Sequence, residues 1–236
     1  MIYKSQNESL LILSKLSDKN PKLDEYSKYC LLREQGLRKK AFDHLERFIK
    51  DIITWSLEER IEFVKLLFPY FEDVKDADYG GFPQPLNIKV VKPTLEEWCS
   101  LEKTNGNPFR WYGKYYRSEE HLNKALKLNP NDDLARITLI LWWSDKIYYS
   151  LHHLPYSYIG NYEKDIELMG EIKKQVYLLN NKEMKESATR NMKINMEILT
   201  NYQNWIKTGD SDFTKWGKKN HKITGYGIKS YYYEYK

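Results

Sequence analysis

Apolar residues recur every three or four positions along most of the chain, which is the spacing of one face of an α-helix. In residues 38–53, for example, this face consists of Ala41, Leu45, Phe48 and Ile52. The same periodicity predicts further helices over residues 6–17, 22–35, 132–150, 162–180 and 182–207. The pattern therefore predicts an all-α fold.

Two short motifs predict where other helices begin. The sequences S-L-E-E at Ser56 and T-L-E-E at Thr94 have the form of a capping box. In this motif a hydroxyl and a carboxylate three residues apart each accept a hydrogen bond from the other residue's backbone N–H. We therefore expect helices to begin at Ser56 and Thr94, and we expect the Asn-Pro pair at residues 107–108 to end the second one.

Residues 75–93 interrupt the helical pattern. They hold a Gly-Gly pair and three of the eight prolines, so we expect a loop there. Apolar and polar residues alternate at its end, which predicts a short strand at 86–91. These breaks divide the chain into an N-terminal helical segment (1–74), a loop (75–93), a second helical segment (94–209) and a tail (210–236), which we expect to form one continuous domain.

Residues 112–133 have a spacing of small residues that is typical of helical repeats. A glycine is followed by a small residue, a large apolar residue, an alanine and a proline, here Gly113, Ser118, Leu122, Ala125 and Pro130. An earlier stretch has the same spacing, with Gly36, Ala41 and Leu45 in the first three positions. Its fourth position holds the large residue Phe48 where the later stretch has Ala125. The two stretches indicate a repeated helical unit.

This spacing resembles the second half of the tetratricopeptide repeat (TPR), a unit of two antiparallel helices. In such a unit we expect glycine to form the turn, small residues to let the two helices approach, and proline to end the second helix. The resemblance implies a right-handed array of antiparallel helical hairpins. A minor β element is then expected only at 86–91 or in the C-terminal tail.

The charge is concentrated at one end of the chain. Of the net charge of +5, residues 205–236 contribute +4, from seven lysines and three acidic residues. A basic tail on a nearly neutral body argues against nucleic-acid binding as the main function, although the aromatic, basic residues 218–236 keep it as an alternative. No segment has the length of a transmembrane helix or the pattern of a signal peptide, so we expect a cytoplasmic protein without membrane contact.

Residues 142–163 contain the strongest candidate binding group. Its members are aromatic, acidic and histidine residues: Trp142, Trp143, Asp145, Tyr149, His152, His153, Tyr156 and Tyr158. Asp145, Tyr149 and His153 are spaced four apart and share one face of a helix. We expect one tryptophan in the core and the other beside a groove.

The histidine pair also has a purely structural explanation. Adjacent helical residues point about 100° apart, so His152 and His153 do not both face one metal ion. We expect one histidine to cap the C-terminus of its helix and the other to lie in the interior. An enzyme that uses either histidine with Asp145 and tyrosines remains an alternative.

The remaining motifs favour binding over catalysis. The chain has no phosphate-binding glycine loop and no nucleophile elbow, and its cysteines lie in no catalytic or zinc-binding pattern. We therefore expect no catalytic residues, no metal and no cofactor. Helical repeats commonly bind proteins, and the chain is expected to be a non-enzymatic protein-binding protein.

The segments L-N-P-N-D-D-L-A-R at 128–136 and H-H-L-P-Y-S-Y-I-G-N at 152–161 give the chain a layout that also resembles small bacterial repeat proteins. Such proteins include immunity proteins, which neutralise a cognate toxin by direct binding. That resemblance implies a toxin domain as the protein partner. Inhibitors of basic toxins are commonly acidic, whereas this chain is basic. We therefore expect either a toxin that is not strongly basic or a local acidic patch, such as Glu72, Asp73, Asp76 and Asp78, that meets a basic one.

Overall fold

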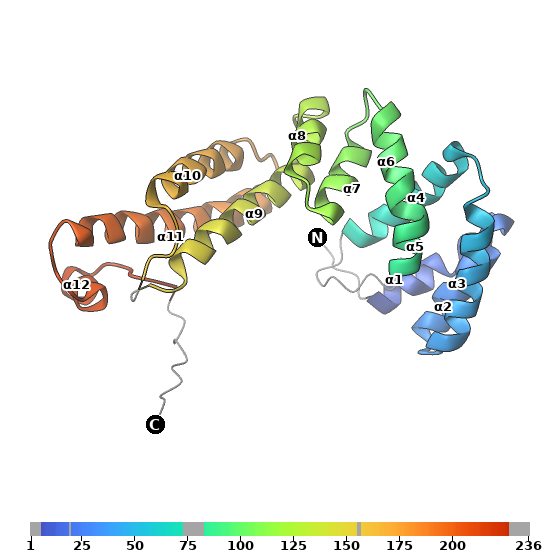
Figure 1. Ribbon diagram of the computed structural model, residues 1–236, viewed down its shortest axis with the longest axis horizontal. Coiled ribbons are helices and arrows are strands. Elements are labelled where there is room, and N and C mark those ends of the chain that lie inside the picture. The colour runs from blue at the N-terminus through green and yellow to red at the C-terminus, as the bar shows by residue number, and fades with distance from the viewer. Residues whose placement is uncertain (1–5, 19, 73–82, 155–156, 227–236) are drawn as a thin grey trace. The chain divides into compact units, whose positions relative to one another are not determined.

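The computed structural model describes residues 6–18, 20–72, 83–154 and 157–226 (Figure 1). These residues form helices joined by turns, and no strand occurs within the described ranges. The predicted all-α fold is therefore confirmed. The chain divides into two compact units, Met1–Lys124 and Ala125–Lys236, and each is described separately here. The four segments expected from the sequence remain a prediction.

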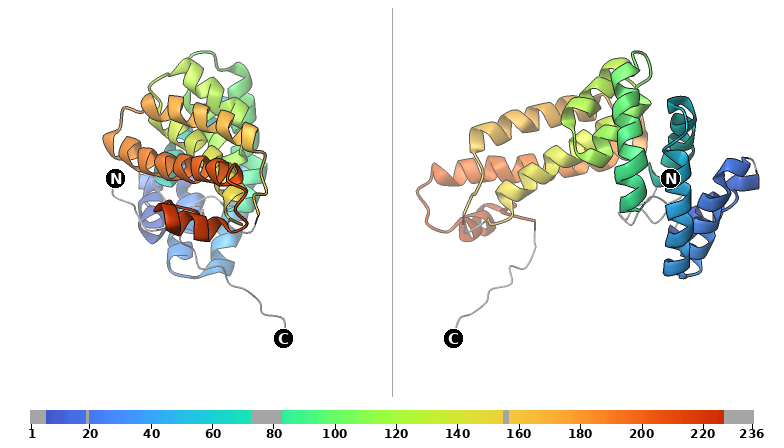
Figure 2. Two further views of the ribbon diagram at one scale, coloured as in Figure 1. Left: turned by 90° about the vertical axis from the view of Figure 1, so that its left-hand side faces the viewer. Right: turned by 45° about the vertical axis from the view of Figure 1, so that its right-hand side comes forward.

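The N-terminal unit consists of short helices whose apolar faces share one core. Its elements are α1 (Gln6–Leu13), η1 (Leu16–Asp18), η2 (Pro21–Leu23), α2 (Asp24–Glu34), α3 (Arg38–Ile52), α4 (Leu57–Glu72), α5 (Gln84–Leu86), η3 (Asn87–Val91), α6 (Lys92–Leu101), α7 (Asn107–Tyr116) and the first part of α8 (Glu119–Leu128). Figures 1 and 2 show α2 and α3 side by side as a hairpin.

Aromatic rings fill much of this core. The Tyr26 ring lies 5.2 Å from that of Phe48 and 5.1 Å from that of Phe63, so it joins α2 to α3 and α4. Further along α4, the Phe68 ring stacks on Trp111 of α7 with 4.8 Å between the ring centres. Large rings bury much apolar surface each, and here they connect helices that are distant in sequence.

The strand predicted at 86–91 is wrong, because these residues are helical. They form the end of α5 and the π-helical turn η3, which leads directly into α6. The N–H of Lys92 bonds to the carbonyl of Asn87, five positions back. This wide turn immediately precedes Pro93, which has no N–H and crowds the preceding helical turn. Pro85 and Pro93, two of the three prolines that suggested a loop, are therefore accommodated within helices, and Pro83 precedes α5. Residues 75–82 of the expected loop lie outside the described residues.

One capping box is formed and the other is not. The Ser56 N–H donates to Glu59 over 3.0 Å, and the Glu59 N–H donates to the Ser56 hydroxyl over 3.3 Å, as expected. Thr94 instead lies inside α6 and is buried, so the helix start predicted there is wrong. The Asn-Pro pair at residues 107–108 begins α7 rather than ending a helix, because proline fits the first helical turn.

Gly113 permits a close helix contact and does not form the expected turn. It lies within α7, where a Cβ atom would be 2.7 Å from Leu122 Cγ and 2.9 Å from the Leu122 backbone nitrogen of α8. The turn is made four residues later by Arg117, whose φ is 52°. Gly36, in contrast, does lie in a left-handed turn, with a φ of 76°. The two glycines of the repeated spacing therefore have different roles.

The C-terminal unit is built from α9 (Asp133–Leu151), α10 (Tyr162–Tyr177), α11 (Lys182–Ile206) and α12 (Phe213–Asn220). The first three helices pack against one another, as both views in Figure 2 show. Their shared core contains the fully buried side chains of Leu139, Met169, Ile172 and Leu199. The described part of the tail, up to residue 226, contains α12 and no strand. The rest of the tail lies outside the described residues.

Gly113→Ala is expected to destabilise the protein by about 2 kcal/mol, because the added methyl group overlaps Leu122 and its backbone. Gly170→Ala is the matched control, since Gly170 lies inside α10 with no atom within 4 Å of its Cβ position. That control should stabilise by about 0.5–1 kcal/mol through helix propensity. Urea denaturation of both variants measures the difference, and equal midpoints would contradict the close contact.

Candidate functional site

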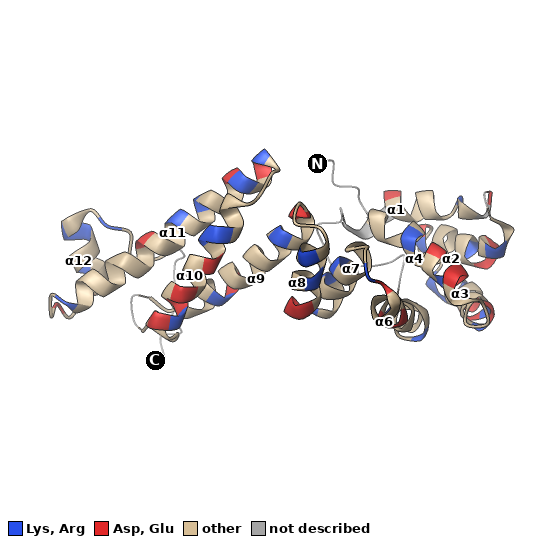
Figure 3. Ribbon diagram, turned by 90° about the horizontal axis from the view of Figure 1, so that it is seen from above, with Lys and Arg blue, Asp and Glu red and all other residues tan. Residues whose placement is uncertain are grey.

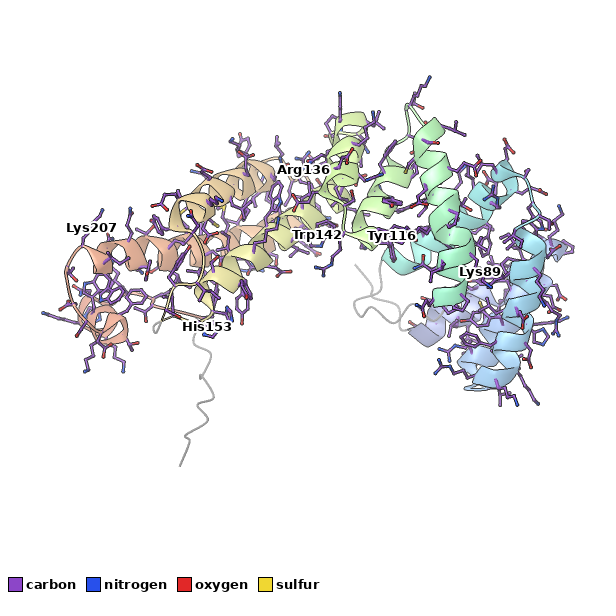
Figure 4. All side chains as sticks on the ribbon, viewed as in Figure 1. Lys89, Tyr116, Arg136, Trp142, His153 and Lys207 are labelled. Carbon is purple, nitrogen blue, oxygen red and sulfur yellow. The ribbon has the colours of Figure 1, made fainter. Side chains whose placement is uncertain are left out.

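Polar side chains fix the first turn of α9 to the helices beside it. The Asp132 carboxylate caps the helix by accepting the N–H of Ala135 over 3.0 Å. The next residue, Asp133, accepts the backbone N–H groups of Asn180 and Asn181 in the turn between α10 and α11, at 3.1 and 2.5 Å. Arg136, labelled in Figure 4, is buried and donates to Gln175 of α10. The start of α9 thus fixes where α11 begins.

Two buried asparagines of α11 hold the chain that follows α12. The Asn201 amide donates to the carbonyl of Ile223 over 2.9 Å, and the Tyr226 hydroxyl donates to the Asn195 side chain over 2.7 Å. These bonds place the Tyr226 ring 4.9 Å from the ring of Tyr148 on α9. The segment 221–226 therefore spans from α11 to α9.

A groove lies between α9 and α11, and Tyr226 forms part of it. We call it the α9–α11 groove. It has a volume of about 230 Å³ and is lined by Leu141, Ser144, Asp145, Tyr148, Asn191, Ile194, Asn195 and Tyr226. Three of its apolar side chains are unusually open to solvent, since Leu141 is 49% exposed and Tyr148 and Ile194 are each 40% exposed. Within the described part of the chain, the Asp145 carboxylate makes no hydrogen bond or ion pair.

Four aromatic rings at the end of α9 continue the exposed surface. We call Tyr148, Tyr149, His152 and His153 the Tyr–His cluster. The His152 ring lies 5.8 Å from Tyr148, 5.2 Å from Tyr149 and 4.2 Å from His153. Tyr149 is 66% exposed, and both histidines are exposed. Since Tyr148 also lines the groove, the cluster and the groove form one continuous surface.

The histidines differ in part from their expected roles. His152 is the C-cap of α9, and its Nδ1 lies 2.6 Å from the carbonyl oxygen of Tyr149, which agrees with the expected helix cap. His153 is exposed, so the expectation of an interior histidine is wrong. Among the described residues, no hydrogen bond joins Asp145 to either histidine. The acid–base pair of the enzyme alternative is therefore not formed.

The tryptophans of α9 lie outside the groove lining. Trp143 is buried in the core, with 9% of its surface exposed, and Trp142 is half-buried. Figure 4 labels Trp142 within α9 and His153 just beyond the C-terminal end of that helix. Of the eight residues expected from the sequence, Asp145 lines the groove and three more belong to the Tyr–His cluster. Tyr156 lies outside the described residues.

Tyr158 belongs to a separate, half-buried polar contact. Its hydroxyl donates to the Asp165 carboxylate of α10, and its ring stacks on Tyr202 of α11 at 4.8 Å. Gly160 makes this contact possible, because a Cβ there would lie 2.2 Å from the Ser150 hydroxyl and 2.5 Å from the Asp165 carboxylate. Burial, followed by the bond to Asp165, raises the pKa of Tyr158. These interactions hold the α9–α10 loop in place.

The sequence pattern identified one of the residues that line the groove, Asp145, and missed the others. Asn191, Ile194 and Asn195 come from α11, and Tyr226 comes from the segment after α12. Asn195 carries the one detectable signal, because it is a polar residue among the apolar positions of a long amphipathic helix, with 5% of its surface exposed. A buried amide of this kind is normally hydrogen-bonded, which points to a partner elsewhere in the chain.

Comparison of the chain with protein-family models, curated proteins and solved structures gives no match. Within the described ranges no helix is both apolar and long enough to cross a membrane. The same ranges contain no group of three or more His, Cys, Asp or Glu side chains arranged to hold a metal ion. Acidic and basic residues are interspersed along the helices of each unit (Figure 3). The geometry of the groove and of the Tyr–His cluster therefore provides the evidence for their function.

Tyr158→Phe is expected to destabilise the protein by about 1–3 kcal/mol, because Asp165 is buried and loses its hydroxyl donor. Tyr177→Phe is the matched control, since Tyr177 is 78% exposed on α10 and should change stability by less than about 0.5 kcal/mol. Urea denaturation at neutral pH measures both. Equal stabilities of the two variants would show that the Tyr158 bond contributes nothing.

Stability is also expected to fall at alkaline pH. Burial raises the pKa values of Tyr158 and Tyr226 above the value of about 10 for an unfolded tyrosine. Their contribution is therefore complete below about pH 10 and is lost as the pH rises further, because the unfolded chain then releases protons more readily. Urea denaturation between about pH 8 and 11 measures this slope, which should be smaller in Tyr226→Phe than in Tyr177→Phe.

Proposed function

We propose that the protein is a non-enzymatic, TPR-like protein-binding protein that contacts its partner with the α9–α11 groove and the Tyr–His cluster. The observation that carries the proposal is the exposure of Leu141, Tyr148 and Ile194 around Asp145, whose carboxylate has no hydrogen bond or ion pair to any residue that the structure describes. Apolar and aromatic side chains gathered on one surface are typical of interfaces, whereas isolated exposed ones are common everywhere.

Several properties of this surface suit a protein partner. Tyrosine is enriched among the residues that contribute most to binding, because its large ring loses little side-chain entropy on burial. Tyr148 is held in place by Tyr226 on one side and His152 on the other, at 4.9 and 5.8 Å, so it is positioned before a partner arrives. Asp145 supplies a charge that fixes orientation through a donor on the partner.

A toxin domain is the specific partner that we propose, because the chain resembles bacterial immunity proteins. The open tyrosine-rich surface supports this choice, since an inhibitor must cover a broad area of its target. Of the acidic patch suggested by the sequence, Glu72 is the last residue of α4, and Asp73, Asp76 and Asp78 lie outside the described residues. In the α9–α11 groove the acidic group is Asp145 alone.

The test is binding to a toxin-like domain encoded beside the gene, measured by calorimetry on the purified, co-expressed pair. Tyr148→Ala combined with Leu141→Ala is expected to weaken the affinity about 30-fold or more, the effect of removing a residue central to an interface. Tyr177→Ala removes a tyrosine ring of α10 that is 78% exposed and does not line the groove, and it should leave the affinity unchanged.

Two results would contradict this proposal. In the first, the two variants affect binding equally, so that the α9–α11 groove is not the contact surface. In the second, no protein encoded by the neighbouring genes binds the wild-type chain, so that the immunity role is wrong. Growth of cells that express the toxin provides a second readout, because the wild-type chain and Tyr177→Ala should protect them while the groove variant should not.

A further inference from the structure

A second groove lies in the N-terminal unit, between α4 and the residues that precede α2. It has a volume of about 300 Å³ and lies beside the turn that joins α3 to α4. Small-molecule sites span roughly 300–1,000 Å³, so this groove is at the small end of that range. Its size suits one or two side chains of a protein segment better than a whole cofactor.

The floor of this groove is apolar and rigidly held. Leu23 and Phe63 form its buried base, each with 1% of its surface exposed. The Trp55 ring is fixed by a hydrogen bond from its Nε1 to Asp51 over 3.1 Å and by an edge contact with Phe48 at 6.0 Å. Leu66 extends the apolar surface toward solvent and is 39% exposed. We call this site the Trp55 groove.

The rim of the Trp55 groove is acidic. Glu58, Glu59 and Glu62 all project from the first turns of α4. Glu62 pairs with Lys65 over 2.7 Å, and Glu59 pairs with Lys22 over 2.5 Å. Glu58 makes no hydrogen bond or ion pair in the part of the chain that the structure describes. The groove therefore combines an aromatic floor with an excess of negative charge.

Lys22 shows which chemistry this arrangement accepts. Its ammonium group contacts the Glu59 carboxylate and lies 5.3 Å from the centre of the Trp55 ring. A carboxylate and a tryptophan face together favour a cation, and tryptophan is the best of the aromatic side chains for this contact. The Lys22 side chain is 57% exposed, and ion pairs at such sites contribute little to stability. Another cation can therefore displace it.

We propose that the Trp55 groove binds a basic, apolar segment of another protein. A lysine or arginine side chain of that segment takes the position of the Lys22 ammonium over Trp55, where Glu58 and Glu59 neutralise it. A neighbouring apolar side chain of the segment packs on Phe63 and Leu66. The match between the acidic rim and the basic segment also favours rapid association.

This inference does not depend on the α9–α11 groove. The two sites lie in different units of the chain and have different chemistry, since one is apolar with a single carboxylate and the other is acidic and aromatic. Each can be removed by substitutions that leave the other intact. Failure of one proposal therefore leaves the other standing.

The test uses the full chain and a fluorescein-labelled amphipathic helical peptide of lysine, leucine and alanine, with binding measured by fluorescence anisotropy. Glu58→Gln combined with Glu62→Gln is expected to weaken binding about fivefold or more. The control is Glu34→Gln combined with Glu46→Gln, which removes the same charge elsewhere in this unit and should change binding less than twofold. Circular dichroism confirms that both pairs fold, since the glutamates of the groove rim project into solvent.

Removal of the internal lysine gives the sharpest result. Lys22→Met should strengthen binding about two- to fivefold, because the peptide no longer competes with the ammonium group over Trp55. Lys28→Met is the matched control, because Lys28 is a similarly exposed lysine that pairs with Asp24 on α2. Equal effects of the two substitutions would indicate general electrostatic attraction and would overturn the proposal.

Two further measurements decide what occupies the groove. A peptide with glutamate in place of each lysine should not bind, and equal binding of both peptides would overturn the proposed charge recognition. Sedimentation of the full chain tests whether a second copy is the occupant. If the wild-type chain forms a dimer that Glu58→Gln with Glu62→Gln dissociates, the groove is a self-association site and the proposal is wrong.

Discussion

The need to satisfy backbone N–H groups at helix starts organises the C-terminal unit. Each α-helix begins with N–H groups that have no partner inside the helix, and Asp or Asn side chains are among the best acceptors for them. All four helices from α9 to α12 begin on such a side chain, namely Asp132, Asn161, Asn181 and Asp212. Asp133 uses the same chemistry across the unit, since it accepts N–H groups from the α10–α11 turn.

This constraint extends to the α9–α11 groove. Because Asp133 fixes the start of α11 against the start of α9, it also fixes which residues of the two helices face each other further along. Asn195 and Asn201 then lie where they can hold the segment 221–226, and Tyr226 reaches Tyr148. The lining of the groove is therefore set by buried polar contacts that lie partly outside it. Such contacts specify one arrangement, because an unpaired buried amide is costly.

The sequence predicts those parts of this structure that depend on neighbouring residues. The apolar spacing gave α3 to within one residue, and the Ser56 capping box is formed. The strand predicted at 86–91 is wrong because alternation and nearby prolines are local signals, and packing overrides them. Val90 and Val91 are instead buried in a continuous helix. The turn predicted at Gly113 is wrong because the sequence alone does not distinguish a glycine at a turn from a glycine at a helix contact.

In the candidate site, too, the features that depend on neighbouring residues could be predicted, and those that depend on distant segments could not. Asp145, Tyr148 and Tyr149 lie on α9, and His152 and His153 directly follow its last residue, so their proximity could be predicted from a spacing of three and four. Asn195 and Tyr226 reach the groove through the pairing of distant segments, and no local pattern contains that information. The pairing depends on a few hydrogen bonds whose partners can only be identified once the helices are assembled.

Local charge also differs from what composition suggests. The chain carries +5 overall, which favours acidic partners if charge is treated as a single number. At physiological salt, however, exposed charges are screened within about 8 Å, so a partner experiences the residues nearest to it. At the Trp55 groove these are Glu58, Glu59 and Glu62, together with Lys22 in the lining and Lys65, which pairs with Glu62. A chain that is basic overall therefore presents acidic residues to a partner that binds along the first turns of α4.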